Sequence, residues 1–152
     1  AEKEGLNKNV FVKLAKIINL FSKTYPEKKI IIRLHPSNSS TKLISKMVKD
    51  SDNIEYHFAN EKTLKSSFES CKVAFFVYGT SLVTDALDYG SIPLILNCKS
   101  HMDFKDLGNK KIVFVFNDLE KLIFFGQKVV NHKNFYKNWS KRCLKFLKKY
   151  YN

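Results

Sequence analysis

Two short stretches of this chain carry side chains that could bind and act on a phosphate group. They are Arg33-Leu34-His35-Pro36 and Tyr78-Gly79-Thr80-Ser81. An imidazole titrates close to neutral pH, so His35 could donate to a phosphate oxygen or act as an acid on a leaving phosphate. Hydroxyl and backbone N–H groups at a helix start, such as those of Thr80 and Ser81, could hold the same anion. We therefore predict an anion-binding site in which His35 is the catalytic residue.

Asp85 could complete a nucleotide site beside these stretches. It lies four residues after Ser81, which places the two side chains on one helix face, one turn apart. A carboxylate there could accept hydrogen bonds from the vicinal hydroxyls of a ribose. Each feature also has a plain alternative: a histidine that bonds only its own loop, ordinary N-capping, and a solvated helix face. Taken together, the residues favour a nucleotide pocket.

The spacing of apolar residues predicts the elements that would position this pocket. Short apolar runs at residues 30–34, 73–77, 93–96 and 112–116 predict buried strands. Residues 54–58 are a further strand candidate, and helical patterns separate all five. Short crossovers of this kind make the strands parallel and the connections right-handed. We expect an α/β fold, a Rossmann-like doubly wound parallel sheet of about five strands with helices on both faces. Ligands bind beyond the carboxyl ends of such strands, and both stretches lie there.

Capping and turn residues predict where several helices begin and end. Apolar residues at helical spacing predict helices over residues 6–24 and 41–49. Asn60 is expected to cap a helix that continues to residue 70, and Gly90 is expected to end the helix that contains Asp85. The spacing Asn117-x-x-Glu120 resembles a capping box, which predicts another helix start.

The last predicted element is a basic amphipathic helix at about residues 133–150. From Lys133 to Lys149 there are seven basic residues and no acidic one, while aromatic and apolar residues recur along one side. The chain has no internal repeat, low-complexity tract or interior linker. We therefore expect residues 1–152 to form a single domain that ends in this helix.

The composition indicates a strongly basic protein but does not identify the partner that its charge attracts. Twenty-seven Lys and Arg residues against 14 Asp and Glu give a formal net charge of +13, which would attract phosphates, nucleic acid or an anionic membrane surface. The lysine-rich composition of a skewed genome would explain the same charge. No stretch reaches the roughly 18 unbroken apolar residues of a membrane span. Nucleic acid is a disfavoured partner, because only the charge supports it.

Several chemistries are disfavoured by motifs that the sequence lacks. Cys71, Cys98 and Cys143 are far apart and odd in number, which suits a reducing cytosol, and no Cys-x-x-Cys pair is present. His57, His101 and His132 have no partner at metal-ligand spacing, so we predict neither a metal nor a cofactor. The sequence also contains no Gly-x-Gly-x-x-Gly, P-loop or Gly-x-Ser-x-Gly motif.

The two stretches resemble motifs of a known enzyme family. Residues 31–36 and 78–93 are similar to the donor-binding C-terminal half of GT-B glycosyltransferases, and the similarity covers about residues 5–130. Asp85 stands where the family's Glu-Ala-Leu-x-x-Gly-x-x-Pro signature has its ribose-binding acid. A His-Pro pair followed by a Thr-Ser or Ser-Ser pair resembles bacterial sialyltransferases, capsule Kdo-transferases and glycerophosphotransferases that use CDP-glycerol. In those enzymes the motifs bind a cytidine nucleotide.

The resemblance implies the donor-binding half of a bacterial surface-polysaccharide glycosyltransferase, with a CMP- or CDP-linked donor as partner. Arg33 or His35 would stabilise the donor phosphate, with Pro36 fixing the loop, while the residues of 78–81 would cradle the phosphate and Asp85 would hold the ribose. An N-terminal acceptor domain would lie on another chain or have been removed, since 152 residues leave no room for one. We expect an excised domain, and the chain begins with Ala1 rather than Met. We expect the isolated domain to be inactive, and cytoplasmic or peripheral at the inner membrane face. The alternative is a non-catalytic module that docks an anionic polymer or membrane through its basic surface.

Overall fold

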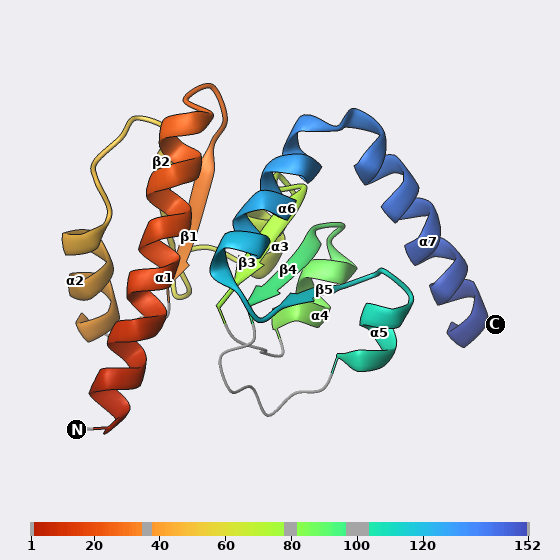
Figure 1. Ribbon diagram of the computed structural model, residues 1–152, viewed down its shortest axis with the longest axis horizontal. Helices are drawn as coiled ribbons and strands as arrows, with labels where there is room; N and C mark the ends of the chain where they lie inside the picture. The colour runs from red at the N-terminus through yellow and green to blue at the C-terminus, as the bar shows by residue number, and fades with distance from the viewer. Residues whose placement is uncertain (1, 35–37, 78–81, 97–103, 152) are drawn as a thin grey trace. The chain divides into compact units, whose positions relative to one another are not determined.

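The chain has an α/β fold in which parallel strands form two small sheets (Figure 1). The computed structural model describes residues 2–34, 38–77, 82–96 and 104–151. It divides the chain into two compact units, Ala1–Ser67 and Phe68–Asn152. The parallel pairing and the alternation of strands with helices were both expected from the sequence, and both are confirmed. The prediction of one domain with one sheet of five strands stays a prediction.

The first unit contains a two-stranded parallel sheet. Its elements are α1 (Glu2–Thr24), β1 (Ile30–Leu34), α2 (Asn38–Met47), β2 (Ile54–Phe58) and most of α3 (Leu64–Phe68). The register runs from Ile30 opposite Ile54 to Leu34 opposite Phe58. Both strands have the predicted bounds, residues 30–34 and 54–58. The β-branched run Ile30–Ile32 is a strong local signal for β1, and the aromatic residues Tyr56 and Phe58 favour a strand at β2.

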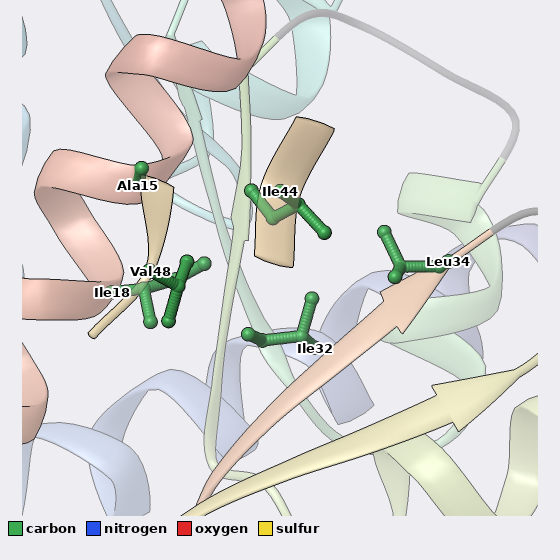
Figure 2. Packing of buried hydrophobic residues seen from close by; sticks show 6 residues of the cluster. All are labelled: Ala15, Ile18, Ile32, Leu34, Ile44 and Val48. Atoms are coloured by element: carbon green, nitrogen blue, oxygen red, sulfur yellow. The ribbon is translucent and has the colours of Figure 1, made fainter. Parts of the chain in front are cut away.

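One face of this sheet is covered by α1 and α2. Ile32 and Leu34 alternate with Arg33 along β1, so their side chains point to the same face. There they meet Ala15 and Ile18 of α1, Ile44 of α2 and Val48, which directly follows α2, as Figure 2 shows. Alternation places Arg33 on the opposite face, together with Glu55 and His57 of β2. One face of the sheet in the first unit is therefore apolar, and the other carries charged and polar side chains.

Asn53 fastens the turn between α1 and β1 to the start of β2. Its Nδ2 donates to the backbone oxygens of Ser22, Tyr25 and Lys28 at 3.2, 3.1 and 3.1 Å. Its Oδ1 accepts from the Ser22 hydroxyl at 2.7 Å. The amide thereby satisfies carbonyl groups that the end of the helix leaves without a partner.

The second unit contains a three-stranded parallel sheet in the order β3-β4-β5. Its elements are β3 (Val73–Phe76), α4 (Leu82–Asp88), β4 (Ile92–Leu96), α5 (Lys105–Asn109), β5 (Phe114–Phe116), α6 (Leu119–Asn131) and α7 (Lys133–Tyr151). All five residues of the central strand β4 are buried. Ile95 packs with Val83 of α4 on one face, and α6 contacts β4 and β5. Helices thus cover both faces of β4, as expected for a strand without alternation.

Helix α7 crosses the amino-terminal ends of the three strands. The Tyr136 hydroxyl donates to the backbone oxygen of Gly90, just before β4, at 2.7 Å. Trp139 is 1% exposed, and its Nε1 donates at 2.8 Å to the oxygen of Ile112, just before β5. The ammonium of Lys72, just before β3, lies 5.5 Å from the centre of the Tyr136 ring. The aromatic side of the predicted amphipathic helix is therefore used in packing within the second unit.

Gly90 ends α4 as the sequence predicted. Its φ of +80° is a conformation that glycine adopts without steric cost. The N–H of Gly90 bonds the oxygen of Leu87 at 3.2 Å, and the N–H of Ser91 bonds the oxygen of Ala86 at 2.8 Å. This pair of bonds is a Schellman motif, and it turns the chain directly into β4.

Two predicted helix caps were wrong, one by three residues and the other by one. We expected Asn60 to cap the helix before β3, but residues 59–62 form a turn and α3 begins at Leu64. The Thr63 hydroxyl accepts from the N–H of Ser66 at 3.1 Å and so caps the helix instead. Similarly, Asp118 rather than Asn117 caps α6, because its carboxylate accepts from the N–H of Glu120 at 3.1 Å.

Among the described residues, no helix is long and apolar enough to cross a membrane.

Candidate functional site

Only two of the predicted site residues can be placed. His35, Pro36, Tyr78, Gly79, Thr80 and Ser81 lie outside the described residues. Arg33 and Asp85 are described, one in each unit. Arg33 is the next-to-last residue of β1, two residues before His35, and Asp85 lies in the first turn of α4, four residues after Ser81. Each described residue therefore lies within four residues of one of the two predicted motifs.

Arg33 is tied to the start of α3. Its Nη1 donates to the backbone oxygens of Lys62 and Thr63 at 2.9 and 3.2 Å, and to the hydroxyl of Ser67 at 2.9 Å. These bonds hold the guanidinium against the residues that lead into α3. Since an arginine side chain has five N–H donors, these contacts leave others on the same group for an anion. Its role toward a donor phosphate stays a prediction.

A buried histidine continues this network across the sheet. His57 lies opposite Arg33 in the register and is 5% exposed. Its Nδ1 is 2.8 Å from the Ser67 hydroxyl, and its Nε2 is 2.9 Å from Oε1 of Glu55. Because Ser67 accepts from Arg33, its own proton is free to go to Nδ1, while Nε2 carries the proton that the carboxylate accepts. The tautomer of His57 that carries its proton on Nε2 is therefore compatible with all the hydrogen bonds from Arg33 through Ser67 and His57 to Glu55.

The network ends at a carboxylate on the molecular surface. Oε2 of Glu55 lies 2.9 Å from the ammonium group of Lys29, which is 63% exposed. Hydrogen bonds from Lys29 and then from His57 lower the pKa of Glu55 from its ordinary value of 4.5 to about 2. Glu55 is therefore ionised at neutral pH and stabilises the N–H of the buried imidazole.

Serine, histidine and glutamate in this order are also the residue types of a hydrolytic triad. A nucleophilic serine must be reachable by its substrate, and Ser67 is only 4% exposed. Its hydroxyl is moreover engaged with both Arg33 and His57. We therefore interpret these residues as a positioning network that fixes Arg33 and the start of α3.

Asp85 is held in place by the burial of its neighbours in α4. Val83 and Ala86 are both fully buried and point into the second unit. Asp85 itself is partly exposed, as a group that binds a ribose would need to be. The side chain of Leu87, two residues on, packs against the same core as Val83. This packing fixes the rotation of the helix, and with it the direction of the carboxylate.

A hollow of about 300 Å³ lies elsewhere on the first unit. It is lined by Lys49, Asp50, Ser51, Asp52, Ile54 and Tyr56. Burial, and secondarily the charge of Asp50, raises the pKa of the Tyr56 hydroxyl. Because Ile54 is the first residue of β2, this hollow lies at the amino end of that strand. The His35-Pro36 pair follows the carboxyl end of β1 in the sequence, so the hollow is not the predicted pocket.

The described residues contain no group of three histidine, cysteine or acidic side chains that could hold a metal ion.

Burial raises the pKa of the Cys143 thiol to about 11, and its side chain packs against the core that includes Val83 and Ile95. A thiol with this pKa is a poor nucleophile at neutral pH. Cys143 is therefore a packing residue.

In comparisons with protein families, with curated proteins and with solved structures, no match to this chain was found.

Sequence reasoning missed the positioning network, although part of its signal was present. Glu55 and His57 are two residues apart on a predicted strand, which places them on one face. The prediction did not include this pair, because it considered His57 only as a metal ligand. Ser67 reaches His57 only because of the turn at residues 59–62, and no sequence pattern indicated that turn.

Proposed function

We propose that this chain is the donor-binding half of a bacterial surface-polysaccharide glycosyltransferase that uses a CMP- or CDP-linked donor. One observation supports it above the others: each predicted motif directly follows a parallel strand. β1 ends at Leu34, immediately before His35-Pro36, and β3 ends at Phe76, two residues before Tyr78. Ligands of parallel α/β sheets bind beyond these carboxyl ends.

In this proposal each residue has a distinct role. His35, together with Arg33, stabilises the donor phosphate and the charge that develops on it as the glycosyl or polyol-phosphate group is transferred. Thr80 and Ser81 donate hydroxyl and backbone N–H groups to the same phosphate. Asp85 accepts hydrogen bonds from the ribose. The acceptor and the general base belong to a separate domain or chain.

We also propose the arrangement of strands that this function requires. The two sheets are parts of one doubly wound sheet of five strands with helices on both faces. The loops after β1 and β3 then lie at one edge of that sheet. The parallel pairing inside each unit, and the helices on both faces of β4, support this arrangement.

A nucleotide titration tests the proposal. We expect CMP or CDP to bind more tightly than UDP or GDP, and to shift the amide signals of Arg33 and Asp85 in NMR spectra. Asp85→Asn should weaken binding about tenfold, because a carboxylate makes stronger hydrogen bonds to hydroxyls than an amide does. Asp88→Asn is the matched control, since Asp88 is exposed on the same helix. If no nucleotide binds near these residues at millimolar concentration, the proposal fails.

His35→Ala separates a binding histidine from one that only orders its loop. A loop residue contributes little core burial, so the melting temperature should not change. Nucleotide affinity should drop by about 1.5–3 kcal/mol, roughly 10- to 150-fold, as for a hydrogen bond to a charged group. Both quantities are measured on one preparation. A lower melting temperature with unchanged affinity would remove His35 from the site.

The alternative function is a non-catalytic module that docks an anionic polymer or membrane. It predicts that the protein is indifferent to all four nucleotides and that its association with anionic surfaces is sensitive to salt. The titration above therefore distinguishes the two functions directly.

A further inference from the structure

Helix α7 has an inner side that packs against the second unit. Trp139 and Tyr136 hold it to the amino-terminal ends of β4 and β5, as described above. The Phe135 ring lies 5.6 Å from that of Phe125 on α6, and Cys143 packs against the core that contains Val83. A helix held in this way cannot turn its aromatic side toward an external partner. Any partner of α7 must meet its outer side.

The outer side carries a row of lysines. Lys133, Lys137, Lys141 and Lys145 follow one another at four-residue intervals, and all four are exposed. The row spans about 18 Å along the helix axis. The helix contains no acidic residue, and within the described part of the chain none of the four lysines forms an ion pair. The row is therefore a strip of uncompensated positive charge.

Leu144 lies in the same strip and is 58% exposed. It follows Lys137 by seven residues, almost two full turns, and so shares its direction. Like charges at four-residue spacing destabilise a helix, and an exposed leucine gains nothing from water. Neither feature stabilises the folded chain, so the strip is better explained by a partner that is both anionic and apolar.

We propose that this strip, Lys133, Lys137, Lys141, Lys145 and Leu144, is a contact surface for an anionic phospholipid bilayer. Lipid phosphates would neutralise the lysines while Leu144 enters the apolar boundary of the bilayer. A linear polyanion would match the lysines but would leave Leu144 in water. The strip lies on the helix that covers the amino-terminal ends of the second sheet, whereas the predicted phosphate loop follows the carboxyl end of β3. Bilayer binding thus goes beyond the proposed donor site and does not depend on it.

Vesicle sedimentation with the full chain tests the proposal. The probes are vesicles of phosphatidylcholine alone, vesicles with about one quarter phosphatidylglycerol, and soluble polyphosphate as the competing polyanion. We expect binding to the anionic vesicles only, and its loss at high salt. Because each lysine near an anionic surface contributes about fivefold, changing all four to Gln should weaken binding by at least about a hundredfold.

A matched variant controls for net charge. Lys16, Lys23, Lys42 and Lys46 are exposed on α1 and α2, and their change to Gln removes the same four charges. This variant should bind vesicles within about threefold of the parent, since its lysines lie outside the strip. Equal losses in both variants would mean that net charge alone drives binding, and the proposal would be wrong. Circular dichroism confirms that each variant is folded.

Leu144 distinguishes a bilayer from a soluble polyanion. Leu144→Ser should weaken vesicle binding about tenfold and leave polyphosphate binding unchanged, whereas Leu144→Trp should bind vesicles at least as tightly as the parent. If Leu144→Ser binds vesicles like the parent, or if polyphosphate displaces the protein from vesicles at equal phosphate concentration, the strip is not a bilayer surface.

Discussion

Both nitrogens of the His57 imidazole have a hydrogen-bond partner, and a residue from a third element orients one of these partners. Ser67 comes from α3, Glu55 from the same strand, and Arg33, which orients Ser67, from β1. A buried polar group costs little when every partner is present and costs much when one is removed. Loss of any one hydrogen bond among Arg33, Ser67, His57 and Glu55 should therefore lower the stability of the first unit.

Ser67→Ala should lower the free energy of unfolding by about 1–3 kcal/mol, because it leaves Nδ1 of the buried His57 without a partner. Ser66→Ala is the neighbouring control. The Ser66 side chain is exposed and bonds only the Thr63 oxygen, so this change should cost less than about 0.5 kcal/mol. Urea denaturation of both variants checks the difference. Equal effects would mean that the network does not stabilise the unit.

Glu55 gives the first unit a specific acid sensitivity. Its pKa is about 2 when folded and ordinarily 4.5, so the folded state holds the carboxylate in its charged form more strongly. Its contribution to stability is fully present above pH 4.5 and is lost as the pH falls toward 2.

The stability difference between the parent and Glu55→Gln should therefore shrink as the pH falls through this range. Urea titrations at several pH values measure the difference. Glu27→Gln, which changes an exposed carboxylate, should show no such trend. A difference that stays constant down to pH 2 would contradict the assignment.

At the scale of elements, the sequence predicted what local patterns determine. β1 and β2 have their predicted bounds, and Gly90 ends α4, because β-branched and aromatic residues and a glycine turn act over a few residues. Helix starts were less predictable, since Asn60 and Thr63 both have side chains that can cap a helix, and in the structure Thr63 is the residue that does so. The bonds of Arg33 depend on the turn that precedes this residue. They could not be read from any local pattern.

Gly90→Ala should destabilise the second unit by more than 1 kcal/mol. A side chain is strained at a φ of +80°, and the added Cβ would lie 3.1 Å from the Tyr136 hydroxyl oxygen. It would therefore also disturb the hydrogen bond that holds α7 to the start of β4. Thermal unfolding measures the loss. Tyr136→Phe removes only that hydrogen bond and should cost less, about 0.5–1.5 kcal/mol. An equal loss would mean that backbone strain contributes nothing.

At the scale of the whole molecule, each unit has its own buried core. The first core joins α1, β1 and α2, and the second joins α4, β4 and residues of α5 and α7. Separate cores would allow the units to unfold separately. The proposed sheet of five strands would instead make them one cooperative domain, because strands in one sheet share hydrogen bonds across the boundary. Native-state hydrogen exchange distinguishes these cases.

Ile44→Ala provides the test. Ile44 is fully buried at the centre of the first core, and its truncation should lower the free energy of unfolding by about 2–5 kcal/mol. In one cooperative domain, the slowest-exchanging amides of β4 should lose as much protection as those of β1. The reciprocal variant Leu122→Ala, which truncates a fully buried residue of α6, should lower the protection of β1 in the same way. Should each variant affect only the amides of its own unit, the chain is two separately folding domains. The single sheet and the pocket formed at its edge would then both be wrong.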